Sequence, residues 1–306
     1  MCVLIRHTFP FLFYLCLNKV LKMATTVKIG GVPEHFNYSW HKAMEEGLFS
    51  AIGIDMQWTD FPGGTGAMAE SLSMGSLDIA IMLTEGAVAA IAKGCPARIL
   101  HFAVDSPLVW GIHTGVGSTL QTEDDIKGKT IAISRYGSGS HLMSIVQAYQ
   151  KKWALDHMQW LEVKNIDGAK QALLAGKADV FLWERYTTKP LVDEGSFRLL
   201  GLLPTPWPAF VLVVSNAFLE QHKPEVEQIS KVILAVQKTL KQEPFLAQIL
   251  STRYQLKEED VLEWLQQTEW SGSKAISEQQ IGEVIEALLK AEVLECQIEP
   301  QRILAS

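Results

Sequence analysis

Cysteine is scarce in this chain of 306 residues, which carries four: Cys2, Cys16, Cys95 and Cys296. No CxxC pair and no cluster of cysteine with histidine occurs, so the sequence gives no support for a zinc or iron–sulfur centre. Two of the four lie near the amino terminus. We expect Cys95 and Cys296 to be buried free thiols, because unpaired cysteine usually behaves as a small apolar side chain.

Motifs for nucleotide binding and for nucleophilic catalysis are also missing. The glycine-rich segment 137–140 has neither the GxGxxG spacing nor a GK[ST] ending, and GxSxG does not occur. Lysine and arginine number 27 against 34 acidic residues, and no basic stretch is present to meet phosphates. We therefore expect no nucleic-acid partner, no metal and no cofactor.

Long apolar runs are absent, and the run at 9–17 is too short to span a bilayer. We expect no stable membrane insertion. Residues 1–23 have the general shape of a secretory signal but end in Val20-Leu21-Lys22 instead of small residues. Two interpretations stay open: a mis-called start before Met23, which favours the cytoplasm, or a leader that places the protein in the periplasm or outside the cell.

Apolar runs of strand length alternate with helical patterns along the rest of the chain, which predicts an α/β fold with a largely parallel sheet. A first block places strands at 27–31, 54–58, 78–82 and 99–104. A second block places them at 109–113, 129–134, 160–163, 180–183 and 210–214, and the chain from 224 onward is helical. Two such blocks with a helical C-terminal segment predict two α/β lobes around a central cleft, where a ligand site is expected.

Three loops repeat one design, in which a strand ends, small or hydroxyl residues follow and a helix begins. Small residues let a ligand approach the backbone, and the first N–H groups of a helix are unpaired donors. Ligands of open α/β sheets collect at the carboxyl ends of strands. The predicted binding residues in these loops are Gly63, Gly64 and Thr65; Thr84 and Glu85; and Gly137, Ser138, Gly139 and Ser140.

Aromatic and acidic residues near these loops complete the predicted site. Aromatic faces at loop positions give rigid walls for a planar or cationic ligand. One acid in each block suits either acid–base chemistry or the binding of an amine or ring N–H. The residues are His35, Asn37, Tyr38 and Trp40 after the first strand, then Tyr136, Trp183, Glu184 and Trp207.

Ordered segments of this chain resemble the ABC-transporter substrate-binding family for nitrate, sulfonates, taurine and thiamine precursors. The resemblance covers about residues 25 to 220. It is carried by 27–29, 35–40, 46–49, 61–65 and 75–80, by the segment DIKGKTIA at 125–132, and by AGKADV at 175–180.

The resemblance implies a type II periplasmic-binding-protein-like fold with crossings between the lobes near 108–110 and 204–209. We expect lobe I to comprise 24–109 and 208–306, and lobe II to comprise 110–207. It also implies a ligand between the lobes and an ABC permease as partner. Thr84-Glu85 and the charged edge at 183–185 depart from the family pattern, which favours a heteroaromatic or amine-bearing ligand such as a pyrimidine.

The function predicted from the sequence is a solute-binding protein, without catalytic residues, that captures a small polar or heteroaromatic molecule for uptake or delivery. The first alternative is a cofactor-free enzyme on the same fold, of the thiamine- or menaquinone-pathway type, with His35 and Glu85 as its polar residues. Another is a ligand-sensing domain that docks on a partner protein through its helical tail.

Overall fold

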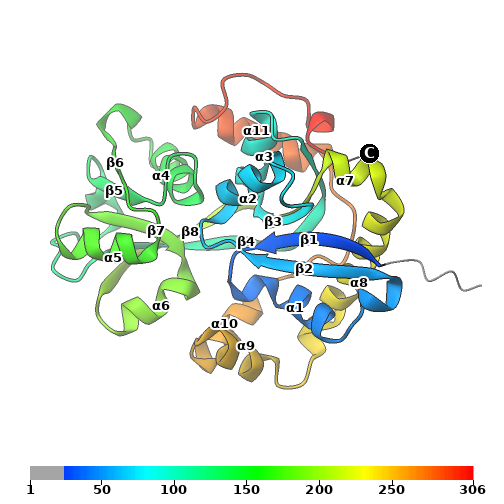
Figure 1. Ribbon diagram of the computed structural model, residues 1–306. Coiled ribbons are helices and arrows are strands. Elements are labelled where there is room, and N and C mark those ends of the chain that lie inside the picture. Colours follow the sequence, from blue (N-terminus) through cyan, green and yellow to red (C-terminus); the bar gives the residue numbers. More distant parts are fainter. Residues whose placement is uncertain (1–23, 306) are drawn as a thin grey trace, which may run out of the picture.

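A single mixed sheet runs through the whole molecule (Figure 1). The computed structural model describes residues 24–305. Its eight strands have the order β2-β1-β3-β8-β4-β7-β5-β6. They are β1 (Thr25–Gly31), β2 (Ile54–Asp60), β3 (Ile79–Leu83), β4 (Ala97–Gly115), β5 (Thr130–Ile133), β6 (Gln159–Glu162), β7 (Val180–Glu184) and β8 (Phe197–Ser215).

Two long antiparallel strands, β4 and β8, join the two ends of this sheet. The first part of β4 and the last part of β8 pair with each other beside β3, whereas their other halves pair beside β7. Between Phe102 and Val109 the β4–β8 register shifts repeatedly, and Pro107 lies opposite Pro208. Proline donates no ladder hydrogen bond, so the ladder is interrupted in this middle stretch, which lies between lobe I and lobe II and is called the hinge below.

The sequence predicted separate strands at 99–104 and 109–113, but one continuous strand covers both. The expectation of a largely parallel sheet holds only at the two ends, where β1 pairs with β2 and β3, and β5 with β6 and β7. The central pairings are antiparallel. The reason is that β8 returns across the hinge alongside β4. Local periodicity in the sequence gives no information about which strands pair with each other.

Helices cover both faces of the sheet at each end (Figure 1). Their apolar faces pack on strands that are buried almost throughout, such as Ile79–Leu83. The helices of lobe I are α1 (Tyr38–Glu45), α2 (Gly64–Ser73), α3 (Thr84–Ala92), α7 (Asn216–Gln221), α8 (Lys223–Thr239), α9 (Leu246–Tyr254), α10 (Glu258–Gln267) and α11 (Glu278–Lys290). Those of lobe II are α4 (Gly139–Gln150), α5 (Ile166–Leu174) and α6 (Arg185–Asp193).

The predicted helical tail is confirmed. Ser277 Oγ accepts a hydrogen bond from Gln280 N at 3.1 Å, which forms part of a capping box at the start of α11. Cys95 and Cys296 are both free, as expected. The expectation of burial is wrong for Cys296, which is exposed after the end of α11, while Cys95 is half-buried; Cys2 and Cys16 lie outside the described residues.

Candidate functional site

A cavity lies between the two lobes, where strands from both ends of the sheet finish. Its volume is about 60 Å³. Both lobes and the hinge contribute its lining residues: Val32, Glu34, Gly63, Gly64, Thr65, Leu83, Leu108, Trp110, Ser134, Arg135, Ser138, Gly139, Ser140, Trp183, Glu184 and Phe210.

Two helices begin at this cavity, one from each lobe. Helix α2 begins at Gly64, whose φ of +66° is a left-handed conformation that favours glycine. Helix α4 begins at Gly139, where a Cβ atom would lie 2.6 Å from the Trp110 ring. The first turns of both helices therefore lie beside the cavity with only small residues in the way, and Gly64 N donates to the carbonyl oxygen of Phe61 at 2.9 Å.

Hydroxyl groups tie these helix starts to the neighbouring strands. Thr65 Oγ1 accepts a hydrogen bond from Leu83 N at 3.2 Å, which fixes α2 against the end of β3. Ser140 Oγ accepts from Ser134 N at 3.0 Å, which fixes α4 against the end of β5. The helix starts are thus held rigidly at the strand ends, as a preformed site requires.

Arg135 brings a positive charge to the lining and also bridges the lobes. Its Nη1 donates to the carbonyl oxygen of Gly63 at 2.5 Å, so a lobe II side chain is bonded to the lobe I loop before α2. Gly66 makes this possible, because a Cβ atom there would lie 2.2 Å from the guanidinium. The arginine therefore reaches across the cleft.

Two carboxylates line another part of the same cavity. Glu184 is buried and caps α6, where its Oε2 accepts from Thr187 N at 2.7 Å and from Thr187 Oγ1 at 2.8 Å; burial raises its pKa to about 7. Glu34 comes from the loop after β1. Burial raises the pKa of Glu34 to about 8, the negative charge of Glu184 adds to the rise, and a hydrogen bond from the Trp183 side chain opposes it.

Aromatic and aliphatic side chains complete the walls. Trp183 is stacked on Phe181 with ring centroids 5.4 Å apart, which holds its ring in one orientation. Trp110 is buried, and its Nε1 has no hydrogen-bond partner within residues 24–305. A buried donor without a partner costs free energy, so an acceptor on a ligand would be favourable there.

The cavity brings together part of the predicted site. The predicted residues that line it are Gly63, Gly64, Thr65, Ser138, Gly139, Ser140, Trp183 and Glu184. They come from one loop of lobe I and two segments of lobe II. The strand-end rule placed these loops correctly relative to the sheet.

Thr84, Glu85 and Trp207 form a separate buried cluster instead of lining the cavity. Trp207 Nε1 donates to Glu85 Oε2 at 2.8 Å, and Thr84 Oγ1 donates to the carbonyl oxygen of Pro208 at 2.5 Å. These bonds connect the start of α3 to the crossing strand β8. Burial raises the pKa of Glu85 to about 7.

The residues predicted after the first strand lie in the core of lobe I. His35 packs edge-on against Trp264 at 4.2 Å between ring centroids, and Trp40 stacks on Phe49 at 5.9 Å. Tyr38 is also buried. The short 3₁₀ helix at 35–37 and the following α1 turn these side chains inward, and the His35 ring lies against Tyr254 of α9 and Trp264 of α10.

Asn37 supports the cavity indirectly, through the loop that carries Glu34. Tyr136 and Gly137 of lobe II lie at the surface. Asn37 Nδ2 donates to the carbonyl oxygen of Val32 at 2.7 Å, which fixes the loop that carries Glu34. Tyr136 is 61 % exposed and packs against His141. Gly137 is exposed and does not line the cavity. Its backbone N donates to His141 Nδ1 at 3.1 Å.

Sequence reasoning missed half of the lining. Glu34 and Arg135 lie directly before predicted residues in loops that follow strands, so the same strand-end rule could have included them. Leu108, Trp110 and Phe210 come from the crossing strands, and only the fold places them at the cavity. The other missed residues are Val32, Leu83 and Ser134.

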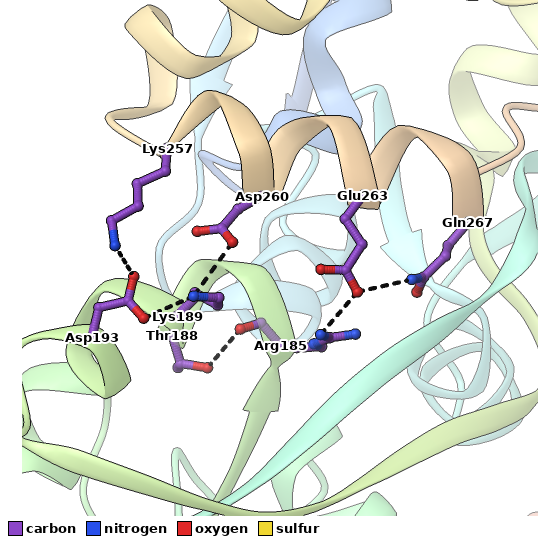
Figure 2. A network of polar contacts seen from close by, with 8 residues as sticks. All are labelled: Arg185, Thr188, Lys189, Asp193, Lys257, Asp260, Glu263 and Gln267. Carbon is purple, nitrogen blue, oxygen red and sulfur yellow. Dashed lines mark hydrogen bonds and ion pairs between the residues drawn. The ribbon is translucent and has the colours of Figure 1, made fainter.

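A polar network links the lobes beside the cavity, between α6 of lobe II and α10 of lobe I. Figure 2 shows the charged side chains of the two helices pointing toward one another. The contacts between the lobes are Arg185 Nη2–Glu263 Oε1 at 3.0 Å, Lys189 Nζ–Asp260 Oδ1 at 3.3 Å and Lys257 Nζ–Asp193 Oδ2 at 2.6 Å. We call these three ion pairs the α6–α10 clasp.

Comparison with known proteins identifies the fold. A family model described as Ca3427-like PBP matches residues 110–203. The Candida albicans CA3427 protein, described as having the generic periplasmic binding protein fold, is 25% identical with a TM-score of 0.84, over 92% of this chain and 96% of its own. No curated protein matches the sequence at a significant level.

Two bacterial binding proteins are also similar in structure. The alkanesulfonate-binding protein SsuA from Xanthomonas axonopodis pv. citri, bound to MOPS, is 19% identical with a TM-score of 0.78, over 92% of this chain and 98% of its own. The nitrate-binding protein NrtA from Synechocystis PCC 6803 is 15% identical with a TM-score of 0.71, over 92% and 85%. The chain has the periplasmic binding protein fold, and both the predicted fold class and the resemblance to nitrate- and sulfonate-binding proteins are confirmed.

No group of three or more His, Cys, Asp or Glu side chains that could hold a metal ion occurs between residues 24 and 305. Of the helices in that range, none has the length and apolar character needed to cross a membrane.

Proposed function

We propose that this protein is a solute-binding protein that captures a small molecule in the cavity between its lobes. The observation that carries the proposal is the composition of the cavity lining, which comes from both lobes and from the strands that join them. A molecule bound there contacts both lobes at once, so its binding free energy favours the closed arrangement over an open one.

Uptake or delivery is the process that fits this capture. The similar structures with a stated role are binding proteins for alkanesulfonate and nitrate, and another is the ligand-binding component of an ABC-type import system from Staphylococcus aureus. By analogy, a permease would receive the ligand when the lobes open. For the lobes themselves we propose the boundaries 109/110, at the end of the stretch of shifted β4–β8 register, and 207/208, next to Pro208 opposite Pro107.

The enzyme alternative receives no supporting observation. Its two named residues, His35 and Glu85, are both buried and neither lines the cavity. Burial also lowers the pKa of His35 to about 3, so this imidazole would not exchange a proton near neutral pH.

Mass spectrometry of the protein purified under native conditions tests the proposal. We expect a small molecule to co-purify and to be recovered unchanged. Arg135→Gln should weaken its retention by about tenfold or more, because the variant loses a charged contact in the cavity and the bond to Gly63. Arg302→Gln, a change at an exposed arginine remote from the cavity, is the matched control.

Conversion of the ligand to a new species would favour the enzyme alternative. Equal retention by the wild type and the Arg135 variant would place the ligand elsewhere. Either result contradicts the proposed function.

A further inference from the structure

We propose that lobe I carries a further binding site, away from the cleft, for a small oxyanion that bears a hydrogen, such as hydrogen phosphate. The site is a cavity of about 160 Å³ beside the first turns of α8, which we call the α8 cavity; its lining includes His101, Lys223, Ser230 and Lys274. None of these residues lines the cavity between the lobes or belongs to the α6–α10 clasp, so the inference is independent of the proposed function. Leu108, which lines the cavity between the lobes, is roughly 20 Å further along β4 than His101, at about 3.3 Å per residue.

Segments that are far apart in the sequence meet at the first turns of α8. The start of β4 carries the histidine. The C-terminal segment lies beside this strand, because Ala305 N donates to the carbonyl oxygen of Ile99 at 2.8 Å. The loop before α11 is fixed to the same strand, since Ser271 N donates to the carbonyl oxygen of Ala103 at 3.1 Å. This loop carries Lys274 to the α8 cavity.

His101 has a buried acceptor atom without a donor. Its Nδ1 lies 2.7 Å from the carbonyl oxygen of Phe102, and because a carbonyl can only accept, Nδ1 carries the hydrogen. Burial lowers the pKa of this imidazole, the bond to Phe102 opposes the change, and the positive charge of Lys274 adds to it. The ring is therefore neutral, and Nε2 keeps its lone pair. Nε2 is buried and has no hydrogen-bond partner within residues 24–305, so a donor there would be favourable.

The same lining has an excess of positive charge. Lys223 and Lys274 face a single acid among the lining residues, Glu227. Neither lysine forms an ion pair with another residue of the described range, 24–305. Ser230 is buried one turn further along α8 and adds a hydroxyl that can donate. Negatively charged oxygen atoms are the partners that these groups favour.

A hydrogen-bearing oxyanion meets both requirements at once. Its charged oxygens would accept from the two ammonium groups and the hydroxyl, and its O–H would donate to His101 Nε2. Sulfate has the charge but no hydrogen, so Nε2 would face another acceptor. Water would donate to Nε2 but leave the lysine charges unbalanced, and a metal cation would be repelled by them. The chemistry of the lining therefore selects hydrogen phosphate over sulfate.

Calorimetry with inorganic phosphate and with sulfate at equal ionic strength tests the site. We expect phosphate to bind at least about tenfold more tightly than sulfate, and His101→Phe to remove that preference, since a phenyl ring offers no acceptor. Lys274→Gln should weaken the binding of both anions by about two- to fivefold, because this exposed lysine contributes charge and no selectivity. Lys231→Gln, a change at an exposed lysine of α8 outside the lining, is the matched control.

Nuclear magnetic resonance gives a direct readout on the wild type, which does not depend on whether a variant folds. In protein with isotope-labelled histidine, phosphate should shift the Nε2 resonance of His101, because this nitrogen then accepts a hydrogen bond. Sulfate at the same concentration should leave the resonance in place.

Arg135→Gln locates the anion. Phosphate held between the lobes would lose affinity in Arg135→Gln and keep it in Lys274→Gln. That result overturns the inference and leaves the proposed function standing. Equal affinity for phosphate and sulfate, an Nε2 resonance that phosphate does not shift, or no binding of either anion also overturns it.

Discussion

Glu34 gives the sharpest test of the site, because its ionisation should destabilise the folded protein. The pKa of this carboxyl rises from 4.5 to about 8 on folding, chiefly through burial. Between pH 4.5 and about 8, the folded state therefore retains on Glu34 a proton that the unfolded state has already released. Since stability falls with pH wherever the folded state binds more protons, the contribution of Glu34 is most favourable below pH 4.5 and is lost as pH rises toward 8.

The magnitude follows from the size of the pKa change. Each pKa unit corresponds to 1.36 kcal/mol, so complete burial would make ionised Glu34 cost about 5 kcal/mol above pH 8. The side chain is only half-buried, and solvent screening reduces the expected cost to about 2 kcal/mol. Glu34→Gln removes the ionisable group and should therefore stabilise the ligand-free protein at high pH but not at low pH.

Thermal unfolding between pH 4.5 and 9 measures this effect. We expect Glu34→Gln to unfold about 4 °C above the wild type at pH 9 and at nearly the same temperature at pH 4.5. Glu70→Gln controls for the loss of a negative charge from the same lobe. If the two variants follow the same pH profile, Glu34 is not held at a raised pKa and the description of the acidic cavity wall is wrong.

Three further substitutions separate binding from stability. Trp40→Ala should lower the free energy of unfolding by about 3–5 kcal/mol without changing the affinity of the remaining folded protein, as calorimetry below the melting transition will show. Trp207→Phe leaves Glu85 Oε2 without its donor, so urea unfolding should show a loss of about 1–3 kcal/mol, larger at pH 8 than at pH 5. Gly139→Ala places a methyl group against the Trp110 ring and should weaken ligand binding in calorimetry, whereas the matched Gly117→Ala, with open space around it, should not; equal affinity in both would contradict the close approach.

The alternation of strands and helices predicted most of the secondary structure. Local periodicity records which side of each segment faces the core, and this information is complete within a short stretch of chain. The segments at 27–31, 54–58 and 78–82 are strands, and the tail contains the expected helices. The long strand β4 was predicted as two strands and only the last part of β8 was predicted, because prolines interrupt a strand pattern even where the chain continues in the same direction.

The candidate site, too, could be predicted from the sequence only where it depends on local patterns. Helix-start loops such as Gly63–Thr65 could be found from sequence, since glycine and hydroxyl residues after a strand have a local conformational reason. Trp40 and Glu34 show the limit of that reasoning. Both follow the first strand within a few residues, yet one is in the core and the other in the cavity.

The sequence by itself therefore determined the α/β class, the binding protein resemblance and the loops at the strand ends, because all of these depend on short-range patterns. Only the tertiary structure decided which acids line the cavity: Glu34 and Glu184 lie there, whereas Glu85 is bonded to Trp207 beside the hinge. The physical reason is that a cavity between two lobes is made by residues far apart in the chain. Their proximity depends on how β4 and β8 carry one lobe onto the other, and no single segment contains that information.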